Sequence, residues 1–82
     1  MVEQAEALLH GLGFVQCRVR HHGNVARIEV EVGEIGRLVS PDAADAVVRG
    51  LNEIGFQYVT ADLRGYRTGS MNEALSAKER GQ

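Results

Sequence analysis

Residues 19–30 read Val19-Arg20-His21-His22-Gly23-Asn24-Val25-Ala26-Arg27-Ile28-Glu29-Val30, and this segment sets the arrangement of the first two strands. Apolar and polar residues alternate on both sides of Gly23-Asn24, which is typical of two half-buried strands joined by a tight turn. Glycine supplies the positive φ that the first central position of such a turn requires. The predicted hairpin register pairs His22 with Val25, Arg20 with Arg27, Val19 with Ile28, and Arg18 with Glu29.

That register sets two arginines opposite each other. Like charges destabilise a strand pair when they face each other directly, whereas Arg18 and Glu29 are expected to form a favourable cross-strand pair. Two interpretations are open. Either the opposed guanidinium groups splay into water, where salt screens them, or three arginines form an anion-binding site: Arg18, Arg20 and Arg27. The alternation also places Tyr58, Thr60 and Asp62 on this face of the sheet, away from the helices.

Two amphipathic helices flank the hairpin. Apolar residues recur with helical spacing in residues 3–12 and 41–54, and Ser40 followed by Pro41 is a typical helix start. Each helix runs into a Gly-Phe pair, which gives the chain a weak internal repeat. A helical turn is expected near residues 34–38, and strands are expected at residues 14–21, 25–32 and 57–63.

The expected fold class is α+β in the order α-β-β-α-β, with two helices on one face of a three-stranded sheet. The third strand should run parallel to the second if the two are neighbours, and the pattern leaves open which strand is central. Residues 1–82 are expected to form a single small domain. Within it, residues 65–82 should form a loop and a short C-terminal tail helix that frays.

Composition narrows the class of protein. The chain has 82 residues, of which 44% are hydrophobic, and a formal charge of −2, so it has room for one core and lacks the basic excess of nucleic-acid-binding modules. Its basic residues are eight arginines and one lysine, a bias that favours bidentate contacts to carboxylate or phosphate. The single cysteine and the absence of a leader or membrane-spanning run predict a cytoplasmic protein.

The other candidate sites are weaker. His21 and His22 point to opposite faces of a strand, so they do not share a metal ion, and Cys17 alternates with Val15 and Val19 as a core residue does. No metal-binding or catalytic residue is expected. Ser70 and Glu73 have capping-box spacing in Gly65-Tyr66-Arg67-Thr68-Gly69-Ser70-Met71-Asn72-Glu73, and a helix start beside Arg67 would suit a phosphate or carboxylate.

Three motifs in order resemble the C-terminal region of the LarE-type PP-loop ATPases, which are ATP-dependent sacrificial sulfur transferases. They are Arg18-Val19-Arg20-His21-His22-Gly23, Ala26-Arg27-Ile28-Glu29-Val30 and the segment 65–73. The resemblance runs from Glu3 to about Leu75. It implies a preceding PP-loop domain that uses ATP and Mg to adenylylate a carboxylate, and a cysteine that gives up its sulfur.

The resemblance also implies site residues. Arg18 and Arg20 match a basic pair near the substrate phosphate, and the other matching positions are Arg27, Arg67 and Ser70, with Glu29, Tyr66 and Asn72 in support. The family's Ser-Gly-Gly-x-Asp-Ser loop and sacrificial cysteine are absent, so this chain is expected to do no chemistry and to hold no cofactor by itself. Expected partners are a PP-loop domain, a phosphate-bearing small molecule and further copies of the chain, but no membrane.

Two alternatives stay open. The first is a stand-alone interaction module in which the arginines meet carboxylates of a partner subunit. The second is a small RNA-binding domain, supported only by the arginine-bearing sheet face with Tyr58 on it.

Overall fold

The computed structural model describes residues 1–66 of the protein. In chain order the elements are α1 (Val2–Gly11), β1 (Cys17–His22), β2 (Val25–Val30), the 3₁₀ turn η1 (Val32–Glu34), α2 (Ile35–Leu38), α3 (Pro41–Ile54) and β3 (Tyr58–Ala61). The predicted tail helix after Ser70 lies outside the described residues.

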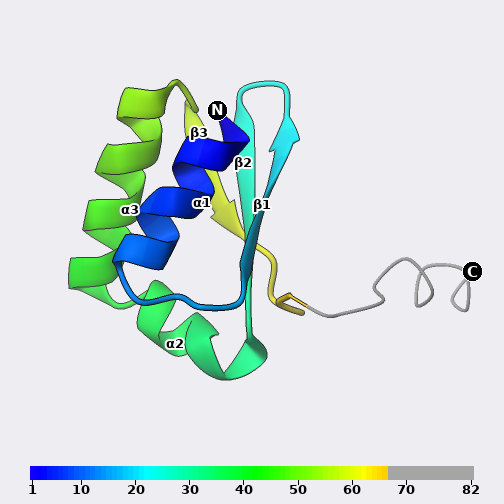
Figure 1. The fold of residues 1–82 in the computed structure, drawn as a ribbon, viewed down its shortest axis with the longest axis vertical. Helices are drawn as coiled ribbons and strands as arrows, with labels where there is room; N and C mark the ends of the chain where they lie inside the picture. The colour runs from blue at the N-terminus through cyan, green and yellow to red at the C-terminus, as the bar shows by residue number, and fades with distance from the viewer. Residues whose placement is uncertain (67–82) are drawn as a thin grey trace, which may run out of the picture.

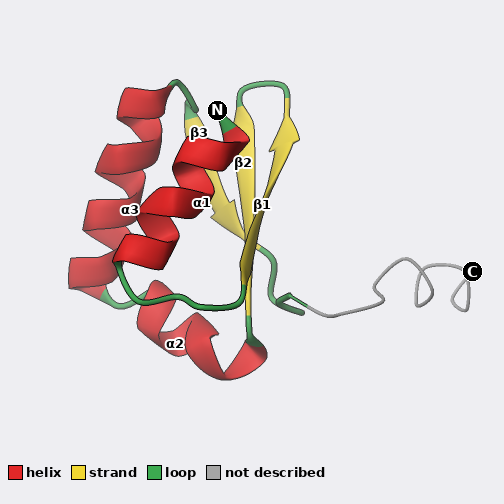
Figure 2. Cartoon of the chain, in the orientation of Figure 1, coloured by secondary structure: helices red, strands yellow, loops and turns green. Residues whose placement is uncertain are grey.

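The elements form two layers (Figures 1 and 2). Helices α1 and α3 pack against each other on one face of a three-stranded sheet whose order is β1-β2-β3. Strand β2 is central, antiparallel to β1 and parallel to β3. The predicted α+β fold and its α-β-β-α-β order are therefore confirmed, and the question of the central strand is settled.

The hairpin has the predicted register. Arg18 faces Glu29, Val19 faces Ile28, and Arg20 faces Arg27. Gly23 has a φ of 58°, a value that glycine adopts without strain. The turn chemistry alone was enough to predict this pairing.

All three strands are shorter than predicted. Strand β1 begins at Cys17 rather than Phe14, because the backbone N–H of Phe14 still donates to Leu9 O (3.0 Å) at the end of α1. Val15, expected on the apolar strand face, is consequently 79% exposed. Strand β2 stops before the 3₁₀ turn, and β3 stops where a turn closes from Gly65 N–H to Asp62 O (3.0 Å).

The internal repeat is visible in how the two long helices end. Gly13 and Gly55 both have positive φ, 99° and 131°, and the N–H of the following phenylalanine donates to a leucine carbonyl five residues back in both cases, Leu9 and Leu51. Both leucines and both phenylalanines are buried. Each helix end therefore directs one aromatic ring into the shared core.

Two residues at α3 differ from a regular amphipathic helix: Ser40 at its N-cap and Gly50 at its contact with α1. Ser40 is at the N-cap position, but its hydroxyl donates to Arg37 O (2.7 Å) and makes no capping bond to α3. Gly50 is inside the helix because a Cβ there would overlap the Leu8 side chain of α1. The missing Cβ lets the two helices approach at this point, at some cost in helix propensity.

Candidate anion-binding face

The face of the sheet opposite α1 and α3 is called the open face here, because no described helix covers it (Figure 1). Alternate residues of each strand point to this side. The polar residues of the open face come from all three strands and from the turn after β3: Arg18, Arg20, Arg27, Glu29, Tyr58, Thr60 and Asp62.

Glu29 lies between the two opposed arginines. Arg20 Nε donates to its Oε1 (3.4 Å), and Arg27 Nη2 donates to its Oε2 (3.1 Å). Glu29 is 7% exposed, so these contacts act at a site where water screens them weakly. The Glu29 carboxylate therefore offsets the repulsion between Arg20 and Arg27 that the register predicts.

This arrangement corrects the expected Arg18–Glu29 ion pair. The two residues face each other along the backbone, yet the carboxylate of Glu29 binds the other two arginines. Long side chains reach diagonal and same-strand neighbours as readily as the residue directly opposite. Each of the two carboxylate oxygens of Glu29 accepts a hydrogen bond from one arginine.

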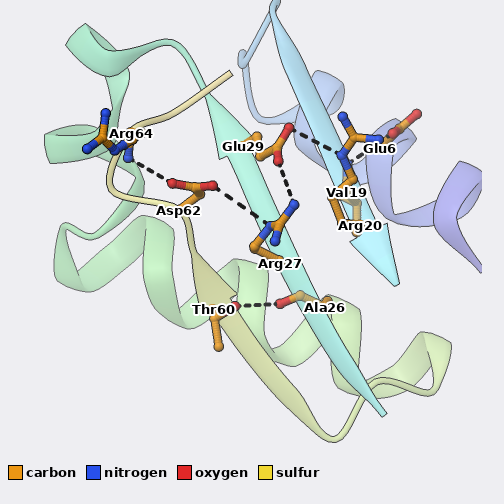
Figure 3. A network of polar contacts seen from close by, with 9 residues as sticks. All are labelled: Glu6, Val19, Arg20, Ala26, Arg27, Glu29, Thr60, Asp62 and Arg64. Atoms are coloured by element: carbon orange, nitrogen blue, oxygen red, sulfur yellow. Dashed lines mark hydrogen bonds and ion pairs between the residues drawn. The ribbon is translucent and has the colours of Figure 1, made fainter. Parts of the chain in front are cut away.

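A further carboxylate extends the network to the turn after β3 (Figure 3). Asp62 Oδ2 lies 3.8 Å from Arg27 Nε, and Asp62 Oδ1 accepts the backbone N–H of Arg64 (2.8 Å). Charges of alternating sign therefore run across the sheet in the order Asp62, Arg27, Glu29, Arg20. The sequence pattern places Asp62 on this face but does not indicate this contact, because the contact requires β3 to lie directly beside β2.

Arg18 has a different environment. Its guanidinium carbon is 5.7 Å from the centre of the Tyr66 ring, and Tyr66 is attached to the central strand through its N–H, which donates to Val30 O (2.6 Å). Arg18 is exposed and makes no ion pair with the described residues. Its planar set of N–H donors is therefore available to a carboxylate or phosphate.

Five of the predicted site residues thus lie on or beside one face: Arg18, Arg20, Arg27, Glu29 and Tyr66. The open face carries three arginines and two carboxylates, an excess of positive charge in a chain whose formal charge is −2. The remaining predicted residues, Arg67, Ser70 and Asn72, lie outside the described part of the chain.

Cys17 and His21 lie among side chains that pack or bond within the fold. Burial raises the pKa of the Cys17 thiol, and the nearby Glu6 carboxylate raises it further, so the neutral thiol is favoured. Glu6 itself accepts the N–H of Val19 (3.0 Å) on the outer edge of β1, and the His21 ring packs edge-on against Phe56 at 5.5 Å. Residues 1–66 contain no cluster of three metal-ligating side chains and no helix long and apolar enough to cross a membrane.

The edge of β3 borders an apolar cavity of about 150 Å³ beneath α3. It is lined mainly by aliphatic side chains, which include Val39, Val47, Val48, Val59 and Ala61. In the described residues no side chain bonds to the outer edge of β3, whereas Glu6 covers an edge N–H of β1. This side of the sheet is therefore the more open to pairing.

Comparison with known proteins links the chain to longer ones. No family model matches it. It is 45% identical over 75 residues to pyridinium-3,5-bisthiocarboxylic acid mononucleotide synthase of Lactiplantibacillus plantarum, which is 92% of this chain and 26% of that protein. It is 40% identical, again over 75 residues, to an uncharacterised protein of Synechocystis, 28% of whose length is covered. The chain thus spans about a quarter of these relatives.

Proposed function

We propose that the open face binds the phosphate of a substrate. The similarity to the Lactiplantibacillus synthase confirms the LarE-type resemblance and is consistent with this chain being the C-terminal domain of such a protein. The chain would act as the non-catalytic C-terminal domain of a LarE-like, ATP-dependent sulfur transferase. The relative is named as a mononucleotide synthase, and a mononucleotide carries the phosphate monoester that such a site would bind.

The observation that carries the proposal is the state of the two arginines of β1. Arg18 makes no ion pair with the described residues, and Arg20 makes one long contact, of 3.4 Å, to Glu29. Both keep N–H donors for an incoming anion, and guanidinium groups bind phosphate oxygens in a bidentate manner. Arg27 is more fully engaged, since it contacts both Glu29 and Asp62.

The proposal divides the work of the longer enzyme. ATP and Mg²⁺ are assigned to a PP-loop domain, as the LarE-type resemblance implies. That domain would carry out the adenylylation, and the cysteine that gives up sulfur would lie outside the present chain. Arg18 and Arg20 would hold the substrate by its phosphate, so that its carboxylate stays within reach of the PP-loop domain.

Titration of the protein with inorganic phosphate and with a nucleoside monophosphate, followed by amide NMR, tests the site. Saturable shifts are expected at Arg18, Arg20 and Tyr66. Arg18→Ala should weaken binding about tenfold, because it removes a charge-assisted contact that contributes about 1.4 kcal/mol.

The matched control is Arg49→Ala, which removes the same charge from α3, where Arg49 pairs with Asp45 (3.1 Å). Its phosphate affinity should stay close to that of the unmodified protein. An absence of shifts at millimolar ligand, or equal losses in the two variants, would contradict a phosphate site on this face.

A second candidate function is self-association without a ligand, which the apolar cavity beside β3 favours. Val48 lines that cavity and is 42% exposed, so Val48→Lys should leave the fold intact while placing a charge in the contact. If the apolar cavity is part of an interface, sedimentation velocity of Val48→Lys should show about a tenfold loss of self-association, which is typical of one buried apolar contact. Val15→Lys, at an exposed position, is the control. A chain that is monomeric at every concentration would exclude this function.

A further inference from the structure

Asp62 lies just after β3 and is held in place on two sides. Its own N–H donates to Ile28 O of the central strand (2.9 Å), and its Oδ1 accepts the N–H of Arg64 (2.8 Å). The second carboxylate oxygen, Oδ2, is left facing Arg27 (Figure 3). The backbone thus fixes the position from which this oxygen acts.

Arg27 has one buried donor that makes no hydrogen bond in residues 1–66. Its Nη2 donates to Glu29 (3.1 Å), whereas its Nε is shielded from solvent and has no hydrogen-bond partner among the described residues. Asp62 Oδ2, at 3.8 Å, is the carboxylate oxygen that this N–H approaches. A buried N–H of a charged group is costly without compensation, so the ion pair with Asp62 favours the orientation of Arg27 in which Nε faces this carboxylate.

We propose that Asp62 is a positioning residue for the anion site. By holding Arg27, it keeps the Arg27 guanidinium against Glu29, and Glu29 in turn keeps Arg20 directed over the open face. Arg27 then supports the site, and the ligand meets Arg18 and Arg20. This inference rests on the proposed function for the identity of the ligand, but the link from Asp62 to Arg20 is independent of it.

Positioning and simple electrostatics predict opposite results when Asp62 is removed. A carboxylate near a phosphate site repels the ligand, so its loss should tighten phosphate binding if charge were its only effect. If Asp62 orients the arginines, its loss should weaken binding, because the freed side chains must be ordered again by the ligand. The sign of the change therefore separates the two roles.

The experiment compares the whole 82-residue chain with two variants of Asp62, Asp62→Ala and Asp62→Glu. The control is Asp45→Ala, which removes a carboxylate from the exposed Asp45–Arg49 pair of α3. Two quantities are measured: the Kd for inorganic phosphate, and the ¹⁵N–¹H heteronuclear NOE of the Arg20 and Arg27 Nε–H groups without phosphate. In Asp62→Ala the Kd should rise about fivefold, the effect of losing one ion pair near the protein surface, and both NOE values should fall. Asp62→Glu should restore much of both, and Asp45→Ala should change neither.

Tighter phosphate binding in Asp62→Ala, or unchanged NOE values, would overturn the positioning role. If the unmodified protein binds no phosphate, the proposed function fails, and the NOE comparison alone decides the link from Asp62 to Arg20. If Asp62→Ala does not fold, Asp62→Asn takes its place, since it removes the charge and keeps the size of the side chain. A fall in both NOE values is expected there too, and unchanged values would again overturn the inference.

Discussion

Phe56→Ala is expected to lower the free energy of unfolding by about 4 kcal/mol, the usual cost of emptying a buried aromatic site. Phe56 is 1% exposed and is held at the end of α3 by its N–H, which donates to Leu51 O (3.0 Å). Because that backbone position is fixed, the surrounding side chains cannot easily collapse into the space left by the ring. A domain of this size has little stability to lose, so the urea midpoint of the variant should fall steeply.

Urea unfolding followed by circular dichroism measures this effect. The control is Val15→Ala, because Val15 is apolar but exposed, and its change should stay within about 0.5 kcal/mol. The internal repeat leads to a second expectation. Phe14→Ala, at the equivalent end of α1, should be destabilising to a similar degree. Losses below about 1 kcal/mol in both phenylalanine variants would mean that the core is not organised around these rings.

Glu29→Ala is expected to cost about 2–3 kcal/mol of unfolding free energy, because it leaves two guanidinium groups facing each other without their shared carboxylate. Arg20 and Arg27 are directly opposed in the register, and Glu29 contacts both. The remaining repulsion is electrostatic, so salt should reduce it. The variant should therefore regain part of its stability between low and high sodium chloride.

The measurement is urea unfolding at both salt concentrations, with Glu31→Ala as the control for loss of one negative charge. Glu31 is exposed and forms no ion pair with the described residues, so its removal should have little effect. Glu29→Gln keeps the side-chain size and should show the same salt response. If Glu29→Ala were as stable as the unmodified protein at low salt, the carboxylate would not be what offsets the opposed arginines.

Much of the fold could be predicted from short segments of sequence. The Gly23-Asn24 turn was sufficient for the register of β1 and β2, and Pro41 and Gly55 marked the ends of α3. Strand β1 was predicted to start too early, because the alternation of Val15 with Cys17 looks like a strand while Phe14 is still bonded to the end of α1. Of the candidate site, the pattern placed the arginines on one face and misjudged which of them Glu29 would bind.

Local patterns in the sequence were enough to predict the order of the elements and which residues face each side of the sheet. Turn residues, helix start and end residues and period-two alternation act over a few positions, so they can be read without knowing the rest of the fold. The central place of β2 and the contact of Arg27 with Asp62 depend on how the strands pack together. Asp62 is far from Arg27 in the chain, and a long arginine side chain contacts whichever acceptors the packed strands bring within reach.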